Sequence, residues 1–473
     1  MQNINELLTK QEQALLLGEE ENRGRSYRPT DFGNAERLVA AHGRDVKYCW
    51  PWRKWYVWDG SRWMEDTRGE VLRRMKATVR GMYAEAGRID DDKERREFLK
   101  FVLRSEQRDR LKAAAELAAS EPETPILPAN LDADPWLLNC LNGTIDLKTG
   151  ELRKHRREDF ITKLCPVNYD PEARSPLFDA FLERVLPDVD VRGYVQKALG
   201  YTLSGDTGLE KLFFAYGPSA TGKSTLLAAV QAVLDDYAAT ADFESFLQQR
   251  RPAGGARNDI ARLAGRRFVL CVEVDEGRKL AESLINSLTG GDVITARFLY
   301  SEGFEFIPRF KLWFAANNRP RVSGPEGAIW RRLVQVPFCE VIPESERDPE
   351  VKARLRTTER PAVLAWLVQG CLSWQKEGLK EPDAVKRLTA DYREESDPLK
   401  DFLAECCTFE PTAQAPNTEI WQVYQDWCKT NGERYPLGRK KFSQALLNRG
   451  LDQYHTGRKR AWIGIGLNAG VFS

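Results

Sequence analysis

The sequence is poor in residues that bind transition metals. It has three histidines in 473 residues, and none of its nine cysteines forms a C-x-x-C pair. These absences argue against a histidine-based metal site, a zinc ribbon and a disulfide framework. The scattered cysteines instead indicate reduced thiols, as in a protein of the cytosol.

Long apolar runs and an excess of one charge are also missing. No apolar stretch approaches the roughly 18 residues that a membrane-spanning helix needs, and the chain does not begin with a signal-peptide pattern. Lys+Arg 71 against Asp+Glu 70 leaves a formal net charge of +1. We therefore expect a cytoplasmic protein without a membrane partner, in which any nucleic-acid surface is a local basic patch.

What is present is typical of a globular protein with several domains. Apolar residues make up 42% and charged residues 30% of the chain. The runs "KLFFAYG", "RFVLCVEV" and "FKLWFAANN" suit buried parallel strands, and they alternate with helical patterns. The sequence thus predicts a multidomain α/β protein with a tail at 1–27 that holds a short helix, an α+β module at 28–175, a core at 176–345, a helical segment at 346–395 and a basic domain at 396–473.

The core contains a phosphate-binding motif. "GPSATGKST" matches G-x-x-x-x-G-K-[ST] and lies between an expected strand and the expected helix "STLLAAVQAVL". Its glycines allow a tight backbone path, so that loop amides and the helix N-terminus face phosphate oxygens. Lys223 would bridge the β- and γ-phosphates, and the Ser224 hydroxyl would bind Mg²⁺. The predicted ATP site comprises Gly217, Pro218, Ser219, Ala220, Thr221, Gly222, Lys223, Ser224 and Thr225.

Polar residues follow the next two apolar runs. Glu273 lies near the end of "RFVLCVEV", where a carboxylate would hold Mg²⁺ and polarise the attacking water, and Asp275 offers a second charge. Asn317 lies near the end of "FKLWFAANN" and would sense the γ-phosphate. The alternatives are an acidic loop that caps the next helix and an ordinary Asn-containing turn.

The order of these motifs resembles a known family. "EVDEGRKLAESLINSLTGGDVITARFLYSEGFEFIPRFKLWFAANNRPRVSGPEGAIWRRLVQVPF" is similar to the superfamily 3 helicase core of phage and plasmid primase-helicases, which include satellite-phage primases and the poxvirus primase-helicase. Upstream, "TDFGNAERLVAAHG", "WYVWDGSRW" and "DPWLLNCLNGTIDLKTGELRKH" resemble the module that precedes this core. The resemblance covers roughly residues 28–470. It implies an AAA+ P-loop ATPase core, a homo-hexameric ring and ATP-driven movement along single-stranded DNA.

The same resemblance implies that each nucleotide site lies between two subunits. A neighbouring subunit must then donate a positive charge to the transferring phosphoryl group. "IWRRL" offers Arg331 and Arg332 as alternative arginine fingers, and a surface salt bridge is the competing interpretation.

A DNA-gripping hairpin is the second feature that the family places in the core. "ITARFLYSEGFEF" fits it, with a tip near residues 300–303, although Tyr300 and Ser301 stand where relatives carry a Lys-His pair. Tyr300 would stack on a base or pack within the hairpin, and nearby arginines would contact phosphates. The candidate DNA contacts here are Arg297, Tyr300 and Arg309.

The end of the chain is predicted to form a winged helix. Between Arg434 and Arg460 it carries eight Lys/Arg and one acidic residue. "GRKKFSQALLNRG" is a candidate recognition helix and "HTGRKRAW" a candidate wing, with a solvated face or a protein-docking surface as alternatives. The candidate contacts are Arg439, Lys440, Lys441, Arg458, Lys459 and Arg460.

Near the start, an aromatic stretch stands before a charged one. Residues 31–66 are expected to form a small β-rich unit with a tryptophan core, and stacking on single-stranded bases is the alternative. Residues 68–120 predict two or three helices, with the acidic run at 90–92 capping one of them. The tryptophans of the aromatic stretch at 31–66 are Trp50, Trp52, Trp55, Trp58 and Trp63.

These features and the resemblance predict an ATP-dependent DNA helicase of a phage, plasmid or integrated element, acting in replication on single-stranded and forked DNA in the cytoplasm of a bacterial host cell. The 3'–5' direction is implied by the resemblance alone. No acidic and histidine metal site of a primase is visible before the P-loop, so we expect a separate primase or polymerase as partner. One alternative is a replication initiator that uses ATP as an assembly switch for origin melting. Another is a small-molecule kinase, against which the Gly290-Gly291-Asp292 segment and the hairpin argue.

Overall fold

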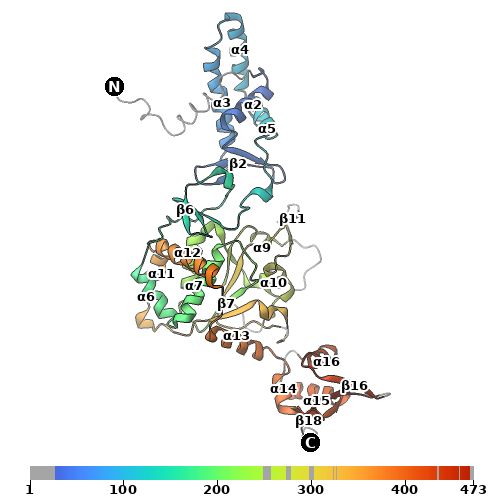
Figure 1. The fold of residues 1–473 in the computed structure, drawn as a ribbon. Coiled ribbons are helices and arrows are strands. Elements are labelled where there is room, and N and C mark those ends of the chain that lie inside the picture. The colour runs from blue at the N-terminus through green and yellow to red at the C-terminus, as the bar shows by residue number, and fades with distance from the viewer. Residues whose placement is uncertain are drawn as a thin grey trace. The chain divides into compact units, whose positions relative to one another are not determined.

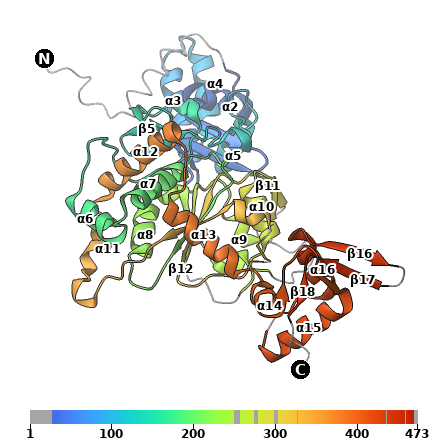
Figure 2. The ribbon, with the colours of Figure 1, turned by 60° about the horizontal axis from the view of Figure 1, so that its bottom comes forward.

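The computed structural model divides the chain into two compact units, shown from two directions in Figures 1 and 2. It describes residues 27–248, 257–272, 278–297, 303–322, 324–325, 327–433, 436–456 and 459–468. The first unit comprises Met1–Ala173, Leu203–Gly205 and Val233–Tyr237, and the second comprises Arg174–Thr202, Asp206–Ala232 and Ala238–Ser473. The short helix expected near the start of the chain lies outside the described residues, and the five segments expected from the sequence stay predictions.

The first unit combines helices with two small antiparallel sheets (Figure 1). Its helices are α2 (Asp31–His42), α3 (Glu70–Ala86), α4 (Asp92–Ser105) and α5 (Arg108–Ala118). One sheet has the order β1-β2-β3, with strands Val46–Cys49, Lys54–Trp58 and Trp63–Glu65. The other has the order β4-β5-β6, with strands Leu137–Cys140, Gly143–Asp146 and Glu151–Arg153. The helices predicted for 68–120 are thereby confirmed.

The expectation of a β-rich unit over 31–66 is wrong for its first third, which is helix α2. The hydroxyl of Thr30 accepts a hydrogen bond from the backbone N–H of Gly33 at 3.1 Å and so caps this helix. Ala35 and Leu38 then lie on one face of α2 and pack into the helical core. The acidic run at 90–92 behaves as predicted, because Asp91 caps α4 through the N–H of Glu94 at 2.7 Å.

The second unit is built on a five-stranded, all-parallel sheet of order β13-β7-β12-β9-β8. Its strands are β7 (Leu212–Tyr216), β8 (Ala238–Ala241), β9 (Phe268–Val272), β12 (Lys311–Ala316) and β13 (Leu333–Pro337). Its helices are α6 (Pro176–Val185), α7 (Val189–Leu203), α8 (Lys223–Leu234), α9 (Asn258–Ala261), α10 (Glu282–Thr289), α11 (Pro349–Leu355), α12 (Arg360–Glu377) and α13 (Asp383–Glu395). The three apolar runs singled out in the sequence are strands β7, β9 and β12, as predicted.

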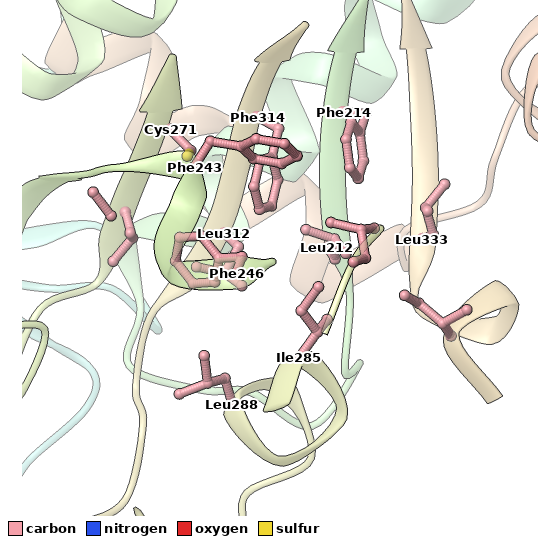
Figure 3. Packing of buried hydrophobic residues seen from close by; sticks show 14 of the residues in the cluster. Leu212, Phe214, Phe243, Phe246, Cys271, Ile285, Leu288, Leu312, Phe314 and Leu333 are labelled. Carbon is pink, nitrogen blue, oxygen red and sulfur yellow. The ribbon is translucent and has the colours of Figure 1, made fainter. Parts of the chain in front are cut away.

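Both faces of this sheet are buried, which explains why its strands read as apolar runs. On one face, the rings of Phe214 and Phe314 stack with centroids 4.7 Å apart, and Figure 3 shows them above leucines of three strands. On the other face, the rings of Phe213 and Trp313 stack at 4.5 Å. The Trp313 indole donates a hydrogen bond to Thr202 at 3.0 Å. The sheet is therefore a rigid base for the loops at its carboxyl edge.

A predicted hairpin and a small separate core complete the second unit. Strands β10 (Ile294–Arg297) and β11 (Gly303–Phe306) pair antiparallel, which confirms the expected hairpin. The last part of the chain encloses its own cluster of apolar residues, which includes Phe402, Tyr424 and Trp462. Its elements are α14 (Lys400–Cys406), β14 (Cys407–Thr408), β15 (Gln414–Pro416), α15 (Asn417–Thr430), α16 (Arg439–Asn448), β16 (Asp452–Thr456), β17 (Lys459–Ile463) and β18 (Gly466–Leu467). Within the described residues, no helix is both long and apolar enough to cross a membrane.

Candidate active site

The phosphate-binding motif lies at the carboxyl edge of the parallel sheet. Strand β7 ends at Tyr216, the motif forms the following loop, and α8 begins at Lys223. In this sheet the chain leaves β7 toward β8 at one edge and leaves the neighbouring β12 toward β13 at the other, so the connections from these two adjacent strands run in opposite directions. Ligands of open parallel sheets bind outside the carboxyl ends of the strands at such a switch point.

The loop requires both of its glycines. A Cβ atom on Gly217 would lie 1.9 Å from the carbonyl oxygen of Phe338. A Cβ atom on Gly222 would lie 2.4 Å from a methyl group of Val185, and Gly222 has a φ of +82°. The motif therefore closes tightly against neighbouring elements, and the tight backbone path expected from the two glycines is confirmed.

Lys223 points back into this loop. Its ammonium group donates to the carbonyl oxygens of Gly217 at 2.8 Å and Pro218 at 2.5 Å, and to the Thr221 hydroxyl at 3.1 Å. The side chain is 5% exposed, and burial lowers its pKa to about 8. No carboxylate pairs with it in the described part of the chain. A bound anion at the loop would offset this desolvation by supplying the missing opposite charge.

Asn317 lies beside the same loop. β12 is the neighbour of β7 and runs parallel to it, so the residues that follow the two strands meet at one edge. The side-chain amide of Asn317 donates a hydrogen bond to the Ser219 hydroxyl at 3.2 Å. Ser219 and Ser224 are both exposed. The structure thus brings together an amide, two hydroxyls and a lysine, a set that can bind phosphate oxygens and a hard divalent cation.

Strand β9 ends at the same edge of the sheet. β9 pairs in parallel with β12, with Val272 opposite Ala315, so the chain reaches the carboxyl edge at Val272. Glu273 and Asp275 themselves lie outside the described residues. Their roles stay predictions.

The two candidate arginine fingers differ sharply in environment. Arg332 is 12% exposed, pairs with Glu210 at 2.5 Å and donates to the Thr289 hydroxyl at 3.1 Å. The side chain of Arg331 is exposed and makes no hydrogen bond or ion pair within the described residues. Both precede β13, at the amino edge of the sheet, while the P-loop follows the carboxyl end of β7. One strand of this length separates the two edges by about 16 Å.

One residue at the carboxyl edge of the sheet was not predicted from the sequence. Arg319 follows β12, is 13% exposed and places its guanidinium 4.7 Å from the ring centre of Tyr216, the last residue of β7. It also pairs with Glu395 of α13 at 2.5 Å and donates to the buried amide oxygen of Gln335 in β13 at 2.9 Å. The only sequence signal was its place after Asn317, in a segment that reads equally well as a turn.

The candidate DNA contacts are spread over three places. Arg297 is exposed opposite Gly303 at the base of the hairpin tip, and Arg309 is half-buried on the segment that leads to β12. Arg439, Lys440 and Lys441 are all exposed in the first turn of α16, and Arg460 is exposed on β17. Lys459 begins β17, while Tyr300 and Arg458 lie outside the described residues.

Comparisons with known families match three stretches of the chain. The family described as "D5 N terminal like" matches residues 35–187, and the one described as "Poxvirus D5 protein-like" matches residues 394–461. Residues 215–332, which include the P-loop and Asn317, match a "Family of unknown function (DUF5906)". The resemblance to the phage and poxvirus primase-helicases is therefore confirmed.

Individual relatives come from large DNA viruses. The chain is 25% identical to "Putative helicase L207/L206" of Acanthamoeba polyphaga mimivirus, over 80% of this chain and 43% of that protein. It is 24% identical to "Putative helicase 022R" of Frog virus 3, over 66% of this chain and 40% of that protein. It is 23% identical to "Putative primase C962R" of African swine fever virus, over 68% of this chain and 36% of that protein. The chain thus spans less than half the length of these relatives.

A solved structure is also among the matches. "The apo structure of NrS-1 C terminal region" aligns with a TM-score of 0.49 at 9% identity, covering 89% of this chain and 96% of that chain.

Proposed function

We propose that this chain is an ATP-dependent DNA helicase of superfamily 3 that translocates 3'–5' on single-stranded DNA during replication. The observation that carries the proposal is the placement of Lys223 and Asn317 on one loop edge, at the switch point of the parallel sheet. The names of the viral relatives, helicase and primase, support a replication role. In this proposal the five-stranded sheet is an AAA+ core.

ATP and Mg²⁺ fit the residues of the P-loop. Lys223 and the loop amides would hold the phosphates, with Ser224 and Glu273 on the metal ion. The environment of Lys223 fits an anion here, because burial depresses its pKa and no carboxylate among the described residues pairs with it. When bound, Mg²⁺ neutralises charge on the phosphates. Asn317, which contacts Ser219, would orient the attacking water.

The arginine finger is assigned to Arg331 and acts on a neighbouring subunit. Arg332 already has two partners in its own chain, whereas Arg331 is exposed. Arg331 lies at the sheet edge opposite its own P-loop, so it reaches a nucleotide only across a subunit interface. This geometry supports a homo-hexameric ring with shared sites.

DNA contacts are assigned to the β10–β11 hairpin and to the C-terminal basic part. The latter contains helices α14, α15 and α16 and the β16–β17 hairpin, and this combination supports the proposal of a winged helix. Exposed cations at the start of α16 would meet the phosphate backbone.

The test is ATP hydrolysis with and without DNA. A helicase responds to any single strand, and it separates a duplex with a 3' tail but not one with a 5' tail. Lys223→Ala should abolish turnover, while Lys386→Ala, a change of a 62%-exposed lysine on α13, should have no effect. Hydrolysis that ignores every DNA would contradict the proposal, and wild-type turnover by Lys223→Ala would refute the ATP site.

A replication initiator is the second candidate, favoured by the exposed basic start of α16. It would respond mainly to one duplex sequence. If the protein separates the strands of a duplex that has no single-stranded tail, and does so only at that sequence, the initiator proposal would replace the helicase proposal.

A further inference from the structure

The tryptophans near the start of the chain fall into two groups. Trp63 is buried at 1% exposure and stacks on Phe160, which confirms the predicted aromatic core for this residue. Trp55 and Trp58 are half-buried in the sheet. Trp50 and Trp52 are 51% and 43% exposed, although Trp is among the most costly side chains to leave in water.

These two exposed tryptophans lie in the turn that joins β1 to β2. Cys49 and Lys54 form the last pair of the two strands, so residues 50–53 are the loop. The N–H of Arg53 donates to the carbonyl oxygen of Trp50 at 3.1 Å, closing a four-residue turn with Pro51 at its second position. Proline fixes φ there, so the turn is stiff.

Each exposed ring is also held from one side. The ring of Trp50 lies edge-on to Tyr48 with centroids 4.9 Å apart, and its indole N–H donates to the carbonyl oxygen of Ala119 at 3.2 Å. The ring of Trp52 lies 6.3 Å from that of Tyr56. The two indoles are therefore oriented before any partner binds, which lowers the entropic cost of binding.

The charges around the turn are mixed, with cations at its tip. Arg53 and Lys54 are exposed, and the segment 50–54 contains no acidic residue. Glu65 of β3 pairs with Lys54 at 2.7 Å, so this exposed lysine already has an acidic partner within the protein. Lys47 is engaged with the carbonyl oxygen of Gly43 at 3.0 Å. Among the described residues, the guanidinium of Arg53 makes no hydrogen bond or ion pair, so it is the cation of the tip that can contact a ligand.

We propose that Trp50 and Trp52 form a stacking platform for unpaired bases of single-stranded DNA, with Arg53 contacting the backbone. Aromatic faces beside a cation are the combination that binds single strands without reading sequence. Duplex DNA does not fit, because its base faces are covered by stacking. The choice of DNA as the occupant rests on the proposed function, whereas the platform itself rests on the geometry of the turn.

The experiment compares binding of a labelled thymidine oligonucleotide by the full chain and its variants. Loss of one stacked base costs about 1–3 kcal/mol, or about 5- to 150-fold in affinity. Trp50→Ala and Trp52→Ala should each weaken binding by at least the lower value, and Trp52→Phe should retain most of it. Phe32→Ala is the matched control, because Phe32 is 51% exposed in the same unit and lies outside the turn.

Two further measurements separate stacking from charge. An abasic oligonucleotide of equal length should bind wild type as weakly as the double tryptophan variant binds the thymidine strand. The slope of log affinity against log salt should stay unchanged in the tryptophan variants and fall by about 0.7 in Arg53→Ala. Basal ATP hydrolysis of the tryptophan variants should match wild type. Trp52→Ala, which removes no side-chain hydrogen bond within the described part of the chain, should also keep the wild-type unfolding midpoint, whereas Trp50→Ala loses the hydrogen bond to Ala119 and should melt somewhat lower.

Three outcomes would overturn the inference. The first is that the double tryptophan variant binds single strands as tightly as wild type. The second is that it loses duplex binding as much as single-strand binding. The third is that it loses oligomeric mass while DNA binding stays intact, which would make the turn a contact between copies of the chain. Tighter binding of a uridine oligonucleotide than of the thymidine one would redirect it to RNA and overturn the DNA assignment. A protein that binds single strands through the turn but hydrolyses no ATP would sink the helicase proposal and leave this inference standing.

Discussion

Replacing Arg331 and Arg332 one at a time separates a catalytic arginine from a structural one. Arg332→Ala removes an ion pair with Glu210 and a hydrogen bond to Thr289. A hydrogen bond to a charged group contributes about 1.5–3 kcal/mol, and half-exposed Glu210 does not become a buried orphan, so we expect a loss of about 2 kcal/mol. Arg331→Ala removes no such contact and should change stability by less than about 0.5 kcal/mol.

The two variants should therefore differ in both their unfolding midpoint and their ATP turnover. A loss of about 2 kcal/mol lowers the unfolding midpoint by about 4–8 °C in a domain of this size. Arg331→Ala should leave the midpoint within about 2 °C of wild type and reduce ATP turnover by about 10³–10⁵-fold. ATP binding should survive in both variants, because Lys223 and the loop remain.

Mixing subunits then tests whether the finger acts in trans. Lys223→Ala subunits keep Arg331, and Arg331→Ala subunits keep the P-loop, so about a quarter of the interfaces in randomly mixed rings pair an intact loop with an intact finger. Turnover should recover toward that fraction, although neither variant is active alone. The reasoning is refuted if mixed rings form but ATP turnover does not recover. It is also refuted if Arg332→Ala, and not Arg331→Ala, abolishes ATP turnover while keeping the wild-type unfolding midpoint.

Three other predictions follow from the P-loop and the basic tail. Because burial lowers the pKa of Lys223 from 10.5 to about 8, ATP affinity measured by titration calorimetry should fall as the pH rises above 8. In the ligand-free protein the unfolded state binds more protons at Lys223 between pH 8 and 10.5, so the unfolding free energy from urea melts should rise across that window relative to that of Lys223→Met, in which this contribution is absent. Gly222→Ala should cost about 1–3 kcal/mol in the same melts, and Val185→Ala in the same chain should restore part of it if the clash is the cause. Replacing Arg439, Lys440 and Lys441 by alanine should flatten the salt dependence of duplex binding by about 0.9 per lost contact with basal ATPase unchanged, whereas Lys429→Ala, 75% exposed on α15, should not.

The sequence predicted the sheet and its loop because their signals are local. A strand buried on both faces is an apolar run, and the P-loop is recognised from a pattern of consecutive residues, although the groups that its glycines pack against, Phe338 and Val185, lie far away in the sequence. The meeting of Asn317 with Ser219 was also predictable, since the carboxyl ends of neighbouring parallel strands share an edge.

Helix α2 was missed because tryptophans further along the stretch outweighed a weak start signal. Thr30 and Asp31 mark a helix start, but the burial of Ala35 and Leu38 depends on α3 and α5, which lie later in the chain. The choice between Arg331 and Arg332 was open for a similar reason. Glu210 and Thr289, which engage Arg332, belong to other elements, and no local pattern points to them.

Arg319 illustrates how a site depends on residues that no motif contains. Gln335 is fully buried in β13, and a polar group there is costly unless it is hydrogen-bonded, so its contact with Arg319 stabilises both. The same guanidinium lies between the rings of Tyr216 and Tyr392, and the Tyr392 hydroxyl donates to the carbonyl oxygen of Pro320. The segment after Asn317 is thereby tied to β7, β13 and α13 at once. The position of Asn317 beside Ser219 is therefore a consequence of packing beneath the loop, and a match to the P-loop pattern alone does not guarantee it.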